Sequence, residues 1–112
     1  MSRLRNFSRQ AAADIDNAVG WLLDHGSAPT AAERLLTTVL AAGETLAARP
    51  LLGRLRPDLL PAPYRFWSIP RWQLLVYDPT SSPATVLRVL NTAHDLPPLL
   101  AELRGSLRAP EE

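Results

Sequence analysis

The stretch YRFWSIPRWQLLVYDPTSSPATVLRVL, residues 64–90, decides the fold. Three runs within it, 64–69, 72–77 and 85–90, are rich in aromatic and β-branched residues, and short proline-containing segments separate them. Connections this short join neighbouring antiparallel strands, because a parallel pair needs a longer crossover. The stretch therefore predicts a three-stranded antiparallel meander.

Two helices are predicted before the meander. The first begins at an N-cap, Ser8, carries apolar residues at helical spacing over 11–22, and ends at Gly26. The second starts with a capping box, Thr30–Glu33, and stops at Pro50. Because about four residues join the helices, we expect them to form an antiparallel hairpin.

The remaining segments complete the predicted order β-α-α-β-β-β-α. Residues 3–7 alternate polar and apolar and predict a short edge strand that buries Leu4 and Phe7. Residues 50–63, with four prolines, are expected to be a loop, and a last helix starts at 96. The fold class is α+β with two layers, the helical hairpin packing on one face of a small, mainly antiparallel sheet. We expect one domain over 1–107 and a frayed tail over 108–112.

Charge is unevenly distributed along the 112 residues, although the formal net charge is only +1. Residues 10–48 carry five carboxylates against one arginine, a net charge of −4, and residues 49–76 carry five arginines against one aspartate, a net charge of +4. All twelve basic residues are arginine. The sequence therefore predicts an acidic helical hairpin and a basic sheet and loop.

Several classes of protein are excluded by what the sequence lacks. It has no cysteine and two histidines, so it has neither a disulfide framework nor a thiolate or histidine-rich metal site. It has no Walker loop, G-x-G-x-x-G, G-x-S-x-G or H-E-x-x-H motif, and we expect no metal or cofactor. No apolar stretch approaches the roughly 20 residues that span a bilayer, and the first residues lack the apolar core of a signal peptide. We expect a cytoplasmic protein with no membrane partner.

Arginine is the most informative residue type for function. If the strands are neighbours, an arginine cluster with one histidine converges on one face and suits an anionic partner. That cluster comprises Arg54, Arg56, Arg65, Arg88 and His94. In the alternative, Arg65 and Arg88 pair with Asp58, Asp78 or Asp95 and pin loops to the sheet.

Other polar and aromatic residues have simpler interpretations. Asp14 and Asp16 are expected to lie on a solvated helix face, and His25 to stabilise a helix end. The tryptophans, Trp21, Trp67 and Trp72, could stack nucleic-acid bases, but we expect them in the core and in a partner interface.

The order of the segments resembles the RelE/ParE superfamily of bacterial type II toxin–antitoxin toxins, in particular the ParE branch. The segments that carry the resemblance are Ala12–Ile15, Ala31–Arg34, Pro50–Arg54, Arg65–Trp67, Leu75–Tyr77, Arg88–Leu90 and Ala93–Leu96. The family commonly reads R-V-L-H-G-A-R-D-L near its end. Here Asn91, Thr92 and His94 depart from that pattern, which leaves a degenerate, non-toxic domain as a further alternative.

The resemblance implies a growth-inhibiting toxin that a partner antitoxin neutralises. ParE-like toxins poison DNA gyrase, whereas RelE-like relatives cleave mRNA in the ribosome. RNA cleavage needs an acid and a base, and arginine stays protonated, so a nuclease here depends on His94 with Arg65 and Arg88 as cations. A net charge of +1 also suits an RNA-rich surface poorly. We therefore expect a gyrase-binding toxin that is not an enzyme, with a ribosome-dependent mRNA endonuclease as the alternative.

The antitoxin is expected to be ParD-like, with a tail that folds on binding, and to form a hetero-oligomer with the toxin. A partner strand can extend an exposed sheet edge, and a partner helix can lie in an apolar groove. The acidic hairpin is a poor surface for an acidic antitoxin. The expected antitoxin-binding residues are Trp21, Arg49, Arg54, Arg65, Trp67 and Arg71.

Overall fold

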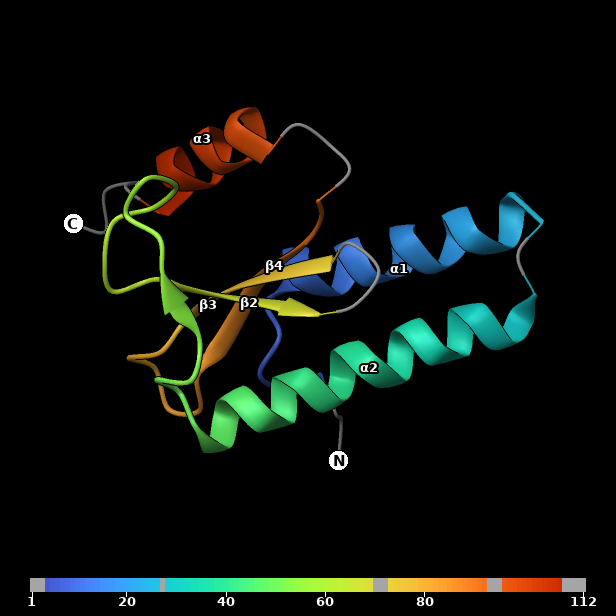
Figure 1. Cartoon of the computed structure of the whole chain (residues 1–112), viewed down its shortest axis with the longest axis horizontal. Helices are drawn as coiled ribbons and strands as arrows, with labels where there is room; N and C mark the ends of the chain where they lie inside the picture. The colour runs from blue at the N-terminus through green and yellow to red at the C-terminus, as the bar shows by residue number, and fades with distance from the viewer. Residues whose placement is uncertain (1–3, 27, 70–72, 93–95, 108–112) are drawn as a thin grey trace.

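The computed structural model describes residues 4–26, 28–69, 73–92 and 96–107 of the chain (Figure 1). The elements in chain order are α1 (Arg9–Asp24), α2 (Pro29–Ala48), β1 (Arg54–Leu55), β2 (Arg65–Ile69), β3 (Gln73–Asp78), β4 (Thr85–Asn91) and α3 (Leu96–Leu107). The strands form one antiparallel sheet in the order β1-β2-β3-β4. The predicted α+β class is confirmed, and the predicted tail over 108–112 lies outside the described residues.

The three predicted strands of the meander are β2, β3 and β4. Phe66 pairs with Val76, and Leu74 pairs with Leu90, so each strand runs antiparallel to its neighbour. The register of β3 and β4 shifts at Val76 and Tyr77. A shift of this kind at one position increases the local twist of the pair.

The first helix has the caps that its sequence predicts. The Ser8 side chain accepts a hydrogen bond from the Ala11 N–H at 3.0 Å, which satisfies one of the free donors at the helix start. The helix ends at Asp24, and Gly26 follows with a φ of +80°. Glycine adopts this left-handed conformation without steric cost, which explains why the chain turns there.

The predicted capping box at Thr30–Glu33 is wrong. The helix α2 begins at Pro29, and its N-cap is Ala28, two residues before the predicted Thr30 and without a side-chain hydrogen bond. Proline is well suited to the first helical position because its fixed φ is already helical and its missing N–H costs nothing there. The helix end is as predicted, with Arg49 as the C-cap before Pro50.

Two short segments differ from their predictions. The expected edge strand at residues 3–7 is, among its described residues, a single parallel bridge between Phe7 and Val86. Phe7 is buried, but Leu4 is 38% exposed. The loop at 50–63 contains a strand that the prolines hide from sequence reasoning, the two-residue β1.

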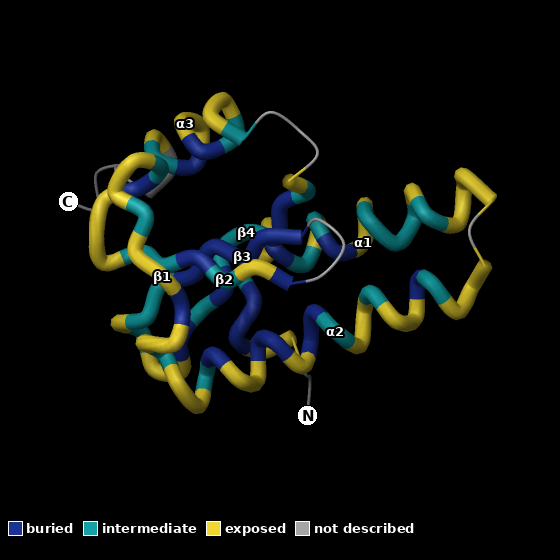
Figure 2. Tube along the Cα trace, in the orientation of Figure 1, coloured by how far each residue is buried: buried dark blue, intermediate teal, exposed yellow. Residues whose placement is uncertain are grey.

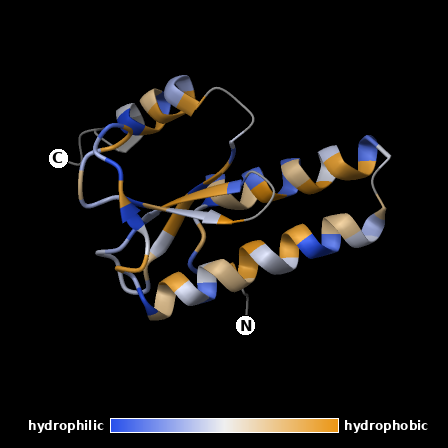
Figure 3. Cartoon of the chain, viewed as in Figure 1, coloured by the Kyte–Doolittle hydropathy of each residue, from blue (hydrophilic) through white to orange (hydrophobic). Residues whose placement is uncertain are grey.

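The sheet has a hydrophobic cluster on each face, so β3 is buried throughout most of its length (Figure 2). Leu75 and Tyr77 pack with residues of α1 and α2, whereas Leu74 and Val76 pack with Leu100 of α3. The hairpin and the sheet form the two predicted layers, and α3 adds cover on the second face. Figure 3 shows hydrophobic residues concentrated in the central strands. Among the helices that the structure describes, none is long and apolar enough to cross a membrane.

Candidate functional site

The outer edge of β4 is closed by the segment before α1. The Val86 N–H donates to the Asn6 carbonyl at 2.8 Å, and the Ser8 N–H donates to the Val86 carbonyl at 2.8 Å. The Ser8 hydroxyl donates to the Leu87 carbonyl at 2.8 Å. One residue of α1, Asp14, accepts the outward Val89 N–H at 2.9 Å. These groups occupy the positions that an added strand would need on this edge.

Arg88 is held at the same edge by an ion pair. Its guanidinium donates two hydrogen bonds to the Asp14 carboxylate, at 2.8 and 3.0 Å, and the two side chains are only 16% and 14% exposed. The hydrogen bonds that Arg88 donates to Asp14 raise the pKa of Arg88, and the charge of Glu102 adds to the effect. The prediction that Asp14 lies on a solvated helix face is therefore wrong. The predicted pairing of Arg88 with a carboxylate holds, but its partner is a helix residue rather than Asp58 or Asp78.

Arg65 fastens the loop that follows α2. Its guanidinium donates to the Gly53 carbonyl at 2.7 Å and to the Leu51 carbonyl at 3.3 Å. Arg65 thus pins a loop to the sheet, as the alternative to an anion-binding cluster predicted. It does so through main-chain oxygens rather than through a carboxylate.

Tyr77, a buried residue of β3, fastens the same loop. Its hydroxyl donates to the Pro50 carbonyl at 2.7 Å and accepts the Gly53 N–H at 2.8 Å, and burial raises its pKa. A Cβ at Gly53 would lie 2.5 Å from the Tyr77 hydroxyl oxygen and 2.8 Å from the Phe66 carbonyl oxygen. The position therefore needs glycine because of close packing. The Pro50–Arg54 motif keeps the loop against this tyrosine, a partnership that sequence reasoning missed.

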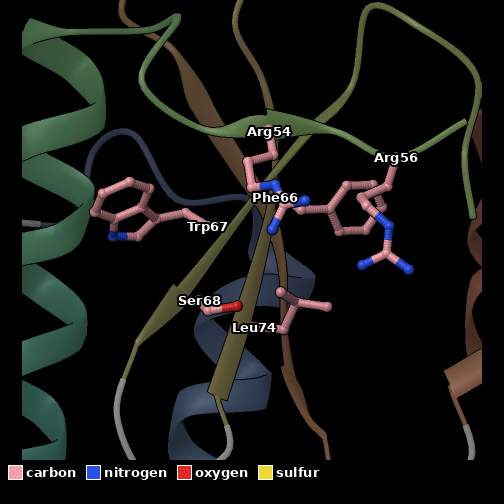
Figure 4. Close-up of a pocket in the computed structure, with 6 residues that line it drawn as sticks. All are labelled: Arg54, Arg56, Phe66, Trp67, Ser68 and Leu74. Atoms are coloured by element: carbon pink, nitrogen blue, oxygen red, sulfur yellow. The ribbon is translucent and has the colours of Figure 1, made fainter.

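Arg54 and Arg56 lie beside a pocket of about 220 Å³ on the face of the sheet that carries α3 (Figure 4). Arg54 is the register partner of Phe66, and Ser68 is the partner of Leu74, so these side chains share one face. Figure 4 shows Arg54 over β2 with Phe66, Ser68 and Leu74 around it. The remaining side chain of the pocket wall, Trp67, points toward α2 and packs on the hairpin core.

The two arginines of this pocket differ in their partners. Arg56 donates to both carboxylate oxygens of Asp58, at 3.0 and 2.8 Å, in an exposed ion pair. This pairing lowers the pKa of Asp58. Arg54 is exposed, and in the described part of the chain its guanidinium has no hydrogen-bond or ion-pair partner. Arg54 therefore offers an uncompensated cation beside the pocket.

The side chains around the pocket have the chemistry to bind an anion. Two guanidinium groups and the Ser68 hydroxyl can donate hydrogen bonds to a carboxylate or a phosphate, and the buried Phe66 and Leu74 form an apolar floor. Guanidinium groups stay protonated and do not act as bases. Within the described ranges, no group of three His, Asp or Glu side chains could hold a metal ion.

The structure brings some of the predicted site residues together and separates others. Arg54 lies on β1, Arg56 follows β1 directly, and Arg65 begins β2. Arg88 lies on β4, at the far side of the sheet. Trp21 and Arg49 lie near opposite ends of the hairpin (Figure 1). The predicted site residues Arg71 and His94, and the predicted interface residue Trp72, lie outside the described residues.

The exposed end of the hairpin carries an aromatic pair. Trp21 is 58% exposed and stacks on His25, with ring centroids 4.0 Å apart and an interplanar angle of 14°. The His25 Nδ1 atom lies 2.8 Å from the Trp21 carbonyl oxygen, one turn back along the helix. This places His25 at the helix end, as its sequence position predicts. An exposed tryptophan of this kind fits the expected partner interface better than the core.

Comparisons with known proteins agree with this architecture. A family model described as the ParE toxin of the type II toxin–antitoxin system parDE matches residues 6–96. Among solved structures, a chain of the chromosomal ParDE toxin–antitoxin system from P. aeruginosa superposes with a TM-score of 0.64 at 20% sequence identity. The match covers 80% of this chain and 98% of that chain, and it supports the fold. The comparison with curated proteins found no match. Because the family match extends over most of the sequence, the chain belongs to the ParE toxin family of type II toxin–antitoxin systems.

Proposed function

We propose that this chain arrests bacterial growth by binding and poisoning DNA gyrase in the cytoplasm, and that a cognate ParD-like antitoxin neutralises it. Membership of the ParE family supports a toxin role. The observation that carries the choice of a protein-binding mechanism is which partners the arginine side chains have. Arg88 is committed to Asp14 and Arg65 to loop carbonyls, which leaves Arg54 as the uncompensated cation of the described site.

This arrangement suits recognition better than RNA cleavage. Cleavage through a 2′-hydroxyl requires a base near the attacking oxygen and an acid near the leaving oxygen. The described pocket supplies cations and a hydroxyl, and Arg56 of its wall pairs with Asp58 and lowers the pKa of that carboxyl, which makes it a weak base and a poor proton donor. An exposed arginine beside an apolar floor is instead a typical anchor of a protein interface.

A supercoiling assay with the purified chain and purified gyrase tests the proposal. We expect inhibition of supercoiling and accumulation of cleaved DNA when the toxin is present in excess. Arg54→Gln should weaken the inhibition, and Arg34→Gln, which removes an exposed arginine of α2, is the matched control and should not. Normal supercoiling at micromolar excess of the folded chain would contradict a gyrase target.

The alternative is a ribosome-dependent mRNA endonuclease. One observation favours it, because Arg54, Arg56 and Ser68 around the pocket could also hold a phosphate. Primer extension after induction would then map cuts within codons, and His94→Ala should abolish them. Growth arrest without such cuts, or full toxicity of the His94→Ala variant, would exclude this mechanism.

Neutralisation is tested by co-expression with the adjacent reading frame. We expect a stable complex of the two chains and normal growth of the cells. The arginines that we propose for antitoxin contact are Arg49, Arg54, Arg65 and Arg71. Loss of the co-purified complex in Arg54→Gln, with the complex kept in Arg34→Gln, would support the basic surface as part of that interface.

A further inference from the structure

The outer edge of β2 is only partly covered by β1. The two residues of β1 pair with Arg65 and Phe66, whereas in the described part of the chain Trp67, Ser68 and Ile69 have strand partners on β3 only. Main-chain groups at an uncovered edge are available to another strand. The sheet therefore has an open half-edge directly next to the first residue of β1.

The half-edge is open because the chain turns away at Gly53. Continuing the register of β1 backwards would place residues 51–53 beside Trp67–Ile69. Instead, Tyr77 binds the Pro50 carbonyl and the Gly53 N–H, and Arg65 binds the Gly53 carbonyl. These bonds hold the loop on the hairpin side of the sheet, and they keep free the place that a longer β1 would occupy.

The pocket lies beside this half-edge, on the α3 face. Ser68 belongs both to the edge and to the pocket wall, and Arg54 is the first residue of β1, next to the half-edge. A strand added here would direct alternate side chains toward that face. One such side chain would meet the unpaired Arg54 guanidinium, so a carboxylate there would form a charge-assisted hydrogen bond.

We propose that the half-edge Trp67–Ile69 receives an extended, carboxylate-bearing segment of a protein partner as an added strand, with a carboxylate bound by Arg54. This inference rests on the proposed function insofar as the toxin acts through protein partners. The segment would run in line with β1 and pair with β2. Recognition would come from main-chain hydrogen bonds along β2 and from the charge and shape of the pocket.

The observations favour a peptide over a nucleic acid. An open strand edge is satisfied by another main chain, and phosphate backbones do not supply the alternating donors and acceptors. Stacking of bases requires exposed aromatic faces, but Phe66 is 3% exposed and Trp67 packs on the hairpin core. The pocket therefore combines a cation, Arg54, that can bind a carboxylate with a strand edge that can pair with the main chain of a peptide.

Fluorescence anisotropy tests the proposal with the purified full chain and a short fluorescein-labelled peptide of alternating threonine and glutamate. The matched probes are a peptide of alternating threonine and lysine and a labelled single-stranded oligonucleotide. We expect binding of the acidic peptide, no binding of the basic one, and a loss of affinity of about tenfold in Arg54→Gln. Arg34→Gln should keep the affinity. Ser68→Asp, which places a carboxylate in the pocket wall, should also weaken binding.

Amide hydrogen exchange shows whether the peptide adds a strand. We expect the acidic peptide to slow exchange of at least one amide among Trp67, Ser68 and Ile69. Binding with unchanged exchange at all three amides would overturn the proposal, as would equal affinity of Arg54→Gln and Arg34→Gln or preferential binding of the oligonucleotide. If the peptide fails while the same preparation still poisons gyrase, this inference fails and the proposed function stands. If the peptide binds as expected while supercoiling continues, the gyrase target fails instead.

Discussion

The two edges of the sheet show how neighbours decide the role of an arginine. At the β4 edge, Arg88 donates to Asp14, and the main-chain groups of the strand bind Asn6, Ser8 and Asp14. At the β2 edge, Arg54 has no partner among the described residues, and the strand is uncovered beyond Phe66. The first edge is completed within the chain, and the second is available to another molecule. A basic side chain on a small sheet therefore indicates function only after its partners are known.

Removing Asp14 should have the largest effect on stability. Asp14→Ala removes both hydrogen bonds to Arg88 and the acceptor of the Val89 N–H, and it leaves a largely buried guanidinium without a counter-ion. We expect the free energy of unfolding to fall by about 3 kcal/mol. Chemical denaturation of the purified variant measures this loss.

The matched control for this variant is Asp16→Ala. Asp16 is an exposed residue of the same helix, so its loss should change the free energy of unfolding by less than about 0.5 kcal/mol. Equal stability of the two variants would mean that the β4 edge is not closed by Asp14.

Tyr77→Phe should have the next largest effect, because it removes the hydroxyl that holds the loop away from the open edge. The variant loses the bond to the Pro50 carbonyl and leaves the buried Gly53 N–H without its acceptor. We expect a loss of about 2 kcal/mol in the free energy of unfolding, measured by chemical denaturation.

The same tyrosine predicts a pH dependence. Because burial raises its pKa above the ordinary value of 10.0, the folded chain keeps a proton that the unfolded chain releases above about pH 10. Stability should therefore fall as the pH rises above 10, and this fall should be smaller in Tyr77→Phe. Parallel pH profiles of the two proteins would contradict the buried, hydrogen-bonded state of the hydroxyl.

Ser8→Ala should be milder. The variant loses the N-cap of α1 and the hydrogen bond to the Leu87 carbonyl. N-cap substitutions of this kind cost about 1 kcal/mol, and we expect a loss near this value. Ser8→Asp is the informative comparison by thermal unfolding, since it restores the cap acceptor but not the donor to Leu87. Full recovery in Ser8→Asp would show that the contact with β4 contributes nothing.

Arg54→Gln should have the smallest effect on stability. An exposed side chain without a partner can be replaced with a change of less than about 0.5 kcal/mol. The same variant should lose partner binding, so Arg54 at the β2 edge serves function without adding stability, whereas Asp14 at the β4 edge serves stability. A loss of stability comparable to that of Asp14→Ala would remove this contrast.

Short sequence patterns predicted the helices and strands that interactions between nearby residues determine. The strands β2, β3 and β4 follow from runs of aromatic and β-branched residues, and the start of α1 follows from Ser8. The start of α2 was misplaced because proline at its first position replaced the side-chain cap that Thr30 would have supplied. The strand β1 has only two residues, which is too short to show a periodicity.

The partners of the arginines could not be predicted because they depend on long-range packing. Asp14 and Arg88 are 74 positions apart, and Gly53 and Tyr77 are 24 positions apart. The sequence identified the residue types that bind anions, and the basic segment that carries Arg54 and Arg56. Three-dimensional contacts then separated Arg65 and Arg88, which stabilise the fold, from Arg54, which has no partner in the described structure.

Amide hydrogen exchange of the free chain tests the contrast between the two edges most directly. The Val86 and Val89 amides are bound by Asn6 and Asp14, so they should exchange slowly, through global unfolding. The fastest of the three amides in Trp67–Ile69 should exchange at least about a hundredfold faster, because it needs only local exposure. Equal protection of the amides at both edges would contradict an open β2 edge.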